Sequence, residues 1–152
     1  MIAQGYTVKE NRIAFWELHV DEDAVNPLTD CDGMGSIYSL NRRHNSYDEA
    51  RIVAAFENRD HVRLSYYEHG SFLWMVQDSP QYRACPDKEW DLVRTAGLWV
   101  PDMYLVEEGL DTQARQAKME EYAAQACEVY SQYCNGEVYG YVVELYPVRE
   151  EE

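Results

Sequence analysis

Two aspartates, Asp30 and Asp32, followed by glycines at positions 33 and 35, have the residue types and spacing of a cation-binding loop. The pattern Asp-x-Asp-Gly opens a calcium-binding EF-hand loop, which also needs a glutamate at its twelfth position. Position twelve counted from Asp30 is Asn41, so the EF-hand is excluded. Two alternatives stay open: a sparser divalent-cation site, and a turn whose glycines supply positive φ angles.

Other residues near this loop could complete a metal site, whereas a phosphate-binding loop is disfavoured. His19, Asp21 and Asp23 precede the loop and offer further nitrogen and oxygen ligands. The stretch Gly33-Met34-Gly35 lacks the lysine and the helix start of a P-loop. A divalent cation is therefore the one cofactor that the sequence allows for, and none is required.

Cysteines and histidines give no pattern typical of catalysis. The four cysteines (Cys31, Cys85, Cys127, Cys134) form no CxxC pair, which disfavours a zinc knuckle or a thioredoxin-type site and favours reduced, mostly buried thiols. The four histidines (His19, His44, His61, His69) show no HxH or HExxH spacing and no nucleophile elbow nearby. We identify no catalytic residue, and the chain is more typical of a binding protein than of an enzyme.

Net charge is the most unusual property of the composition. The chain has 28 acidic and 13 basic residues, a net charge of −15. Direct binding to nucleic acid or to acidic lipid is disfavoured, because both depend on cationic side chains. A basic partner protein, or one that itself binds nucleic acid, is favoured. The 13 tyrosines and four tryptophans indicate a folded chain rather than a disordered one.

The elements expected around these residues define an α+β protein. Residues 6–20 predict a hairpin turning near Asn11, residues 36–40 a strand, and residues 61–76 a second hairpin turning at His69-Gly70. A capping box at Ser46-Tyr47-Asp48-Glu49 predicts a short helix to about Asn58. Residues 137–146 predict a last strand well inside a sheet. We expect an antiparallel sheet of hairpins with one short and one long helix packed on it.

The long helix is expected from Asp111, its N-cap, to about Cys134, before Asn135-Gly136. Its core stripe is predicted at Met119, Tyr122, Ala126, Val129 and Tyr133. Residues 1–149 are expected to form a single domain and residues 150–152 an acidic tail. The first residues lack the zones of a secretion signal, and no run of about 18 apolar residues occurs, which predicts a cytoplasmic protein without a membrane span.

Acidic side chains concentrate in the last third of the chain, where residues 101–152 hold 12 acids and three bases. Those before and along the long helix are the predicted partner-binding residues: Glu107, Glu108, Asp111, Glu120, Glu121 and Glu128. Gathered on one side, they could imitate the phosphates of a nucleic acid. A solvated helix face that keeps the protein soluble is the other interpretation.

Several motifs resemble a family of small acidic uncharacterised proteins found in bacteriophages, plasmids and bacterial genomes. They are Asp32-x-x-Gly35 leading into a strand that ends at Arg42-Arg43, the Tyr67-Glu68-His69-Gly70 turn, and residues 135–141 (Asn-Gly-Glu-Val-Tyr-Gly-Tyr). The resemblance spans about residues 26–145 and carries over no catalytic or binding residue. It implies a mobile-element context, in which proteins of this size often act on host restriction or CRISPR systems.

Two functions follow as hypotheses. The first is a non-enzymatic phage or mobile-element protein that binds and inhibits a basic host protein, such as a defence nuclease or CRISPR effector, through an acidic surface in the bacterial cytoplasm. In that form it is an antirestriction or anti-CRISPR DNA mimic. The alternative is a divalent-metal-binding module or metal-dependent enzyme centred on the Asp30/Asp32 loop. The sequence leaves the oligomeric state open, and self-association through aromatic strands is a third possibility.

Overall fold

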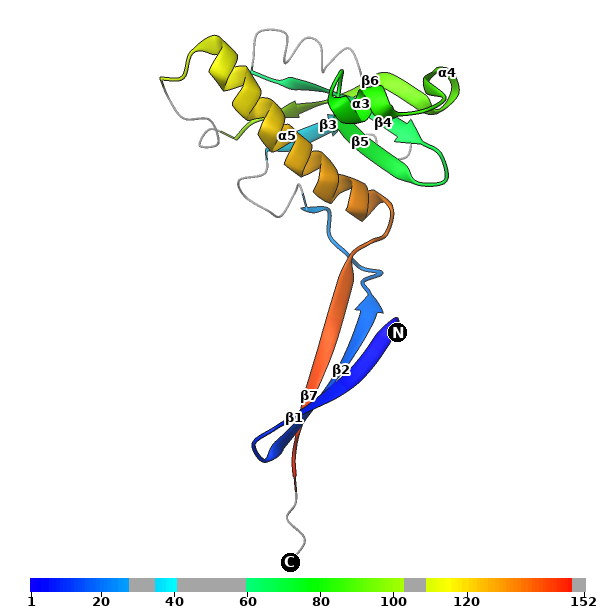
Figure 1. Cartoon of the computed structure of the whole chain (residues 1–152), viewed down its shortest axis with the longest axis vertical. Coiled ribbons are helices and arrows are strands. Elements are labelled where there is room, and N and C mark those ends of the chain that lie inside the picture. Colours follow the sequence, from blue (N-terminus) through cyan, green and yellow to red (C-terminus); the bar gives the residue numbers. More distant parts are fainter. Residues whose placement is uncertain (28–34, 41–59, 103–108, 149–152) are drawn as a thin grey trace, which may run out of the picture. The chain divides into compact units, whose positions relative to one another are not determined.

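The computed structural model describes residues 1–27, 35–40, 60–102 and 109–148. The chain divides into two compact units (Figure 1). Unit 1 comprises Met1–Ala24 with Gly136–Glu152, and unit 2 comprises Val25–Asn135. Helices and antiparallel strands occur together, so the predicted α+β class is confirmed. The single domain expected for residues 1–149 stays a prediction.

Unit 1 is a three-stranded antiparallel sheet in the order β1-β2-β7. Its strands are β1 (Ala3–Lys9), β2 (Arg12–Val20) and β7 (Tyr139–Pro147). The hairpin predicted around Asn11 is confirmed, and Glu10 takes the left-handed conformation in its turn, with φ of 54°. The last strand was expected well inside a sheet, and this is wrong: β7 lies at the edge of the described sheet. Its apolar sequence indicated burial, but no described residue of unit 1 is buried.

Unit 2 contains a four-stranded antiparallel sheet in the order β3-β6-β4-β5. Its strands are β3 (Ser36–Ser39), β4 (Val62–Glu68), β5 (Phe72–Val76) and β6 (Leu92–Val100). The strand predicted at residues 36–40 and the hairpin at residues 61–76 are therefore confirmed. The two largest fully buried side chains are Trp74 on β5 and Trp99 on β6. They anchor the core of this unit, which continues onto the long helix.

The long helix α5 (Thr112–Cys134) packs against β5 and β4 and confirms the predicted bounds (Figure 1). The Asp111 carboxylate accepts a hydrogen bond from the Ala114 N–H at 2.8 Å, as expected of an N-cap. The predicted core stripe is partly wrong, because Val129 is exposed and Tyr122 is only half-buried. The buried residues are Met119, Ala123, Ala126, Cys127, Tyr130 and Ser131. The small side chains among them let the helix approach the ring of Trp74.

Ser131 of α5 and Asn135, the C-cap residue of this helix, form hydrogen bonds to the sheet through their side chains. The Trp74 N–H donates to Ser131 Oγ at 2.8 Å, and this hydroxyl donates to the Cys127 carbonyl oxygen at 2.7 Å. The Asn135 side chain accepts from the Phe72 N–H and donates to the Phe72 carbonyl oxygen, both at 2.7 Å. Asn135 thus satisfies both backbone groups of Phe72.

Two short helices, α3 (Pro80–Ala84) and α4 (Lys88–Asp91), link β5 to β6. The short helix predicted from Ser46 to about Asn58 lies outside the described residues. None of the described helices is both long and apolar enough to cross a membrane.

Candidate functional site

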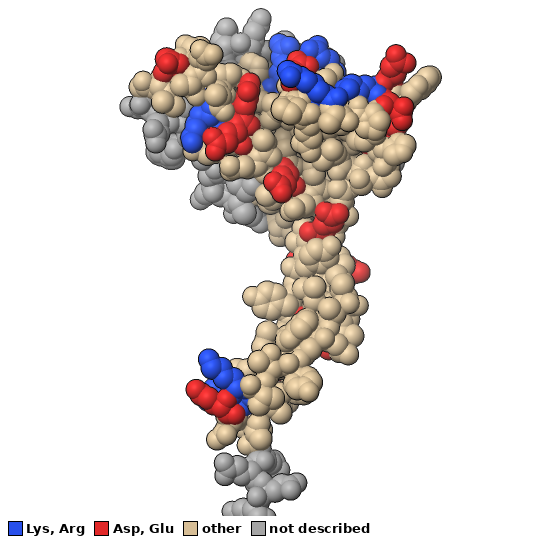
Figure 2. Space-filling model, viewed as in Figure 1, with Lys and Arg blue, Asp and Glu red and all other residues tan. Residues whose placement is uncertain are grey.

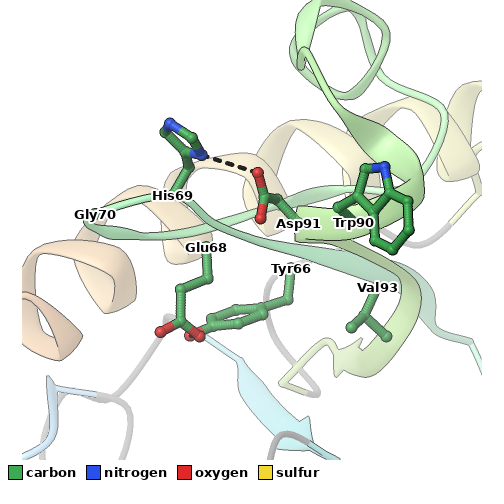
Figure 3. Close-up of a pocket in the computed structure, with 7 residues that line it drawn as sticks. All are labelled: Tyr66, Glu68, His69, Gly70, Trp90, Asp91 and Val93. Carbon is green, nitrogen blue, oxygen red and sulfur yellow. Dashed lines mark hydrogen bonds and ion pairs between the residues drawn. The ribbon is translucent and has the colours of Figure 1, made fainter.

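An open hollow of about 550 Å³ lies beside the turn between β4 and β5 (Figure 3). The residues that line it are Tyr66, Glu68, His69, Gly70, Trp90, Asp91 and Val93. They come from three places in the sequence: the end of β4 with its turn, the helix α4, and the start of β6. The hollow therefore depends on the pairing of β4 with β6 rather than on any one segment.

The register between β4 and β6 brings the lining residues together. Tyr67 lies opposite Leu92 and Tyr66 lies opposite Val93. Asp91 directly precedes Leu92, so it reaches the level of the β4–β5 turn. At this turn the His69 N–H donates to the Ser71 carbonyl oxygen at 3.3 Å, and Gly70 has a φ of 80°, which favours glycine.

Helix α4 presents Trp90 and Asp91 at the rim. Asp87 begins it in the left-handed conformation with φ of 49°, and its carbonyl oxygen accepts from the Trp90 N–H at 3.0 Å and the Asp91 N–H at 3.1 Å. Trp90 is 86% exposed. A large apolar side chain left in water on a short helix beside charged groups is typical of a contact residue rather than a core residue.

Asp91 is held by His69 across the rim. The His69 ring Nδ1 lies 2.8 Å from the Asp91 Oδ2 (Figure 3). The Tyr67 ring stacks on the imidazole with centroids 6.3 Å apart. Lower in the hollow, the Tyr66 hydroxyl donates to Glu68 Oε2 at 3.2 Å. The Asp91 carboxylate is therefore held by an imidazole, and the Glu68 carboxylate contacts a tyrosine hydroxyl on the other side of β4 (Figure 3).

The local potential is negative. Desolvation raises the pKa of the Tyr67 hydroxyl, and the Asp91 carboxylate raises it further, followed by Cys85 and Asp87. Lys88, the one base in α4, donates instead to the Arg83 carbonyl oxygen at 2.9 Å. Two carboxylates and an indole around an open hollow are the groups that bind a guanidinium or an ammonium.

Catalysis through the His69–Asp91 pair lacks a partner. A histidine oriented by a carboxylate can activate a hydroxyl or a thiol within hydrogen-bond reach. The seven described residues that line the hollow include no serine, threonine or cysteine. The His69 side chain is also 66% exposed, which leaves it in contact with water.

The predicted metal residues Asp30 and Asp32 lie outside the described residues, and a site there stays a prediction. The turn interpretation is confirmed at Gly35, where φ is 73° and a Cβ would lie 2.5 Å from Trp99 Nε1. The Gly35 N–H donates to Asp102 Oδ2 at 3.2 Å. Across residues 1–27, 35–40, 60–102 and 109–148, no three His, Cys, Asp or Glu side chains are grouped as metal ligands.

The proposed additional ligands have local partners. His19 Nε2 lies 3.0 Å from Glu17 Oε2, and Asp21 Oδ1 accepts from the Asp23 N–H at 3.1 Å. These contacts lie within unit 1 and are typical of an exposed strand end and turn.

The predicted partner-binding acids on the long helix are exposed but spread apart. Glu121 and Glu128 are seven residues apart and share one stripe, about 10 Å from each other along the axis. Glu121 pairs with Lys118 at 3.6 Å, and Glu120 accepts from Gln116 at 3.2 Å. Asp111 is used as the N-cap. Glu107 and Glu108 lie outside the described residues.

Charge along α5 is nearly balanced. Three acids within Thr112–Cys134 (Glu120, Glu121, Glu128) face two bases (Arg115, Lys118), a net charge of −1. On the face seen in Figure 2, acidic side chains are separated by uncharged surface and by Lys and Arg. These positions stay predicted contacts, and the described helix has fewer unpaired carboxylates than its acid count suggests.

Sequence reasoning did not select Glu68, Trp90 or Asp91. The available signals were the His69-Gly70 turn and an acid-rich segment around Trp90, both of which are visible in the sequence. What joins them is the β4–β6 register, which depends on tertiary pairing.

Comparison with protein-family models, with curated proteins and with solved structures finds no match to this chain. The resemblance to small acidic proteins of phages and plasmids stays a prediction.

Proposed function

We propose that this chain is a non-enzymatic binding protein that takes up an arginine or lysine side chain of a basic partner protein in the hollow at the β4–β5 turn. The observation that carries the proposal is the exposed Trp90 indole, which lines the same open hollow as Glu68 and Asp91. The indole supplies a surface for a cation and the carboxylates supply its counter-charge.

Two interactions would stabilise a bound cation in the hollow. A cation over an indole contributes about 0.5–2 kcal/mol, with the larger value reached as water is excluded. Charge-assisted hydrogen bonds between a guanidinium and a carboxylate are about twice as strong as neutral ones. A single side chain therefore gives a weak contact, and a neighbouring acid such as Asp87 would favour a segment with several basic residues.

The identity of the partner belongs to the same proposal. The net charge of −15 attracts basic proteins over several ångströms and repels nucleic acid. Together with the resemblance to mobile-element proteins, this supports a role in the bacterial cytoplasm. There the protein would occupy the nucleic-acid-binding surface of a host defence nuclease or CRISPR effector. The acids of α5 would then add long-range attraction around the hollow.

An arginine-rich peptide of about ten residues, fluorescently labelled, tests the site itself. Anisotropy should show binding to the wild-type chain at low salt, and Glu68→Gln with Asp91→Asn together should weaken it about tenfold or more. Glu89→Gln is the matched control, because it removes one acid of α4 that does not line the hollow. Equal binding by the double variant and the control would overturn the assignment of the site.

A further inference from the structure

The sheet of unit 1 has one face without charge over most of its length. Strand alternation and the β1–β2 and β2–β7 registers place alternate residues on this side. We call it the apolar face: Ala3, Gly5, Thr7, Ala14, Trp16, Leu18, Val20, Tyr139, Tyr141, Val143 and Leu145. Lys9 and Arg12 lie at one end of it. Figure 2 shows uncharged surface along most of unit 1, with charged side chains gathered near one end.

The opposite face of the same sheet is interrupted by charge. It carries Glu17, His19 and Glu144 among exposed apolar side chains such as Val8 and Val142, and its aromatic rings contact one another. Phe15 lies 6.0 Å from Tyr6 and 5.6 Å from Tyr146 between ring centroids. An antiparallel sheet with one charged face and one apolar face normally packs the apolar face against another layer.

Within unit 1, no described residue forms such a layer on the apolar face. Tyr141 is 75% exposed, and Trp16, Val20, Tyr139, Val143 and Leu145 are also exposed. A continuous apolar surface of this kind marks an interaction site in a folded protein. A three-stranded sheet also needs a covered apolar face to be stable.

We propose that a second copy of this chain covers this surface, so that two unit 1 sheets stack through their apolar faces in a symmetric dimer. The exposed large side chains of the face offer roughly 600 Å² per copy, given that a whole aromatic side chain buries 150–250 Å². Two copies would bury about 1,200 Å², the lower bound for a stable interface. Sheets stacked in this way lie about 10 Å apart.

Charge favours this one face for self-association. Two chains of net charge −15 repel each other, so copies can meet only where acids are absent. With the strands of the two copies antiparallel, the Lys9 and Arg12 end of one apolar face lies over the end of the other that is flanked by Asp21 and Glu137. The opposite arrangement would place the two basic ends together.

Shape favours the same arrangement. A hollow of about 400 Å³ on unit 1 is lined by Thr7, Lys9, Glu10, Arg12, Ala14 and Leu145. Trp16 lies across Gly5, where a Cβ would be 2.6 Å from the ring, and occupies the middle of the face. A two-fold axis at Trp16 brings Tyr141 of one copy to the level of Leu145 and the hollow in the other. The most exposed aromatic ring of the apolar face thus meets the recess.

Adjacent valines on β7 provide a matched test. Val143 lies on the apolar face and is 49% exposed, whereas Val142 lies on the charged face and is 53% exposed. The mass of the full-length wild-type chain, measured by analytical ultracentrifugation over a concentration series, should reach that of a dimer, twice 17.8 kDa. Val143→Glu should raise the dimer dissociation constant about 100-fold or more, because it buries an unpaired carboxylate from each copy. Val142→Glu should change it less than threefold.

Each outcome decides the proposal. A wild-type chain that stays monomeric at the highest concentration overturns it, and so do open-ended oligomers, which indicate pairing of strand edges. Equal effects of the two variants also overturn it. If Val143→Glu fails to fold by circular dichroism, Tyr141→Ser takes its place, and a dimer as tight as wild type would overturn the proposal.

Discussion

The imidazole Nδ1 of His69 lies 2.8 Å from the carboxylate of Asp91, although the two residues are 22 positions apart. This contact joins the β4–β5 turn to the end of α4 and fixes one carboxylate at the rim of the hollow. Because the pair is exposed, its own contribution to stability is small. Its effect is to hold Asp91 beside Trp90, and this arrangement can be tested by substitution.

Replacing Trp90 with alanine should weaken binding of the arginine-rich peptide about threefold to 30-fold, since it removes the cation–π contact. The free energy of unfolding should change by less than about 0.5 kcal/mol, because the indole is exposed. Trp90→Phe keeps an aromatic ring and should recover part of the affinity. Anisotropy and urea denaturation measure the two quantities. Unchanged affinity in Trp90→Ala would remove the indole from the site.

Neutralising the α5 acids together, with Glu120→Gln, Glu121→Gln and Glu128→Gln, should weaken the same binding only a few-fold. Lys118 and Gln116 already contact two of these carboxylates. Their remaining effect is long-range attraction, which salt screens. Should this triple variant lose binding while Glu68→Gln with Asp91→Asn keeps it, the partner surface would be the helix, as the sequence alone predicted.

Ser131→Ala should lower the free energy of unfolding by about 1–3 kcal/mol. The change leaves the buried backbone N–H of Trp74 without its acceptor, the Ser131 hydroxyl oxygen 2.8 Å away. Gln132→Ala, at the next and exposed position of α5, is the control and should shift stability by less than about 0.5 kcal/mol. Urea denaturation at pH 7 compares them. Similar values for both variants would mean that the hydroxyl does not stabilise the packing of the helix on β5.

The free energy of unfolding should fall at alkaline pH, because the buried thiols ionise less readily in the folded chain than in the unfolded one. Burial raises the pKa of Cys127 from 9.0 to about 12 and that of Cys134 to about 11. Below pH 9 both thiols are protonated in either state and have no effect on the pH dependence. Above pH 9 the unfolded chain releases protons that the folded chain keeps, so each thiol lowers stability by about 1.4 kcal/mol per pH unit up to its folded pKa.

Denaturation at several pH values between 8 and 11 measures this slope. Cys127→Ala should lower stability below pH 9 through the cavity that it leaves, and it should reduce the slope above pH 9, so that the two stabilities converge as the pH rises. A slope identical to that of the wild type would show that Cys127 ionises as readily in the folded protein as in the unfolded one.

Local patterns in the sequence were sufficient to predict most of the individual helix ends, strands and turns that the structure describes. The N-cap at Asp111 and the Asn135-Gly136 end of α5 are short-range signals, and so is the His69-Gly70 turn. Burial was harder to predict, because apolar content describes a surface that needs covering and not what covers it. Val129 was predicted in the core stripe of α5, and the strand that contains Tyr141 was predicted well inside a sheet, yet both residues are exposed.

The candidate site depended on information that the linear sequence does not carry. Glu68 and Asp91 line the same hollow only because Tyr67 pairs with Leu92 across β4 and β6. A shift of the register by one residue would turn these side chains to the other face. Acid content indicated a basic partner, but it pointed to α5, where three acids are offset by Arg115 and Lys118.

Salt dependence of binding tests the central claim, that a basic segment docks at Glu68, Trp90 and Asp91, most directly. Affinity of the wild-type chain for the arginine-rich peptide should fall at least tenfold between 50 and 500 mM salt, because screening weakens attraction between exposed charges. The double variant Glu68→Gln with Asp91→Asn should start weaker and show a shallower decline. A wild-type affinity that does not change with salt, or one that the double variant retains, would contradict the account.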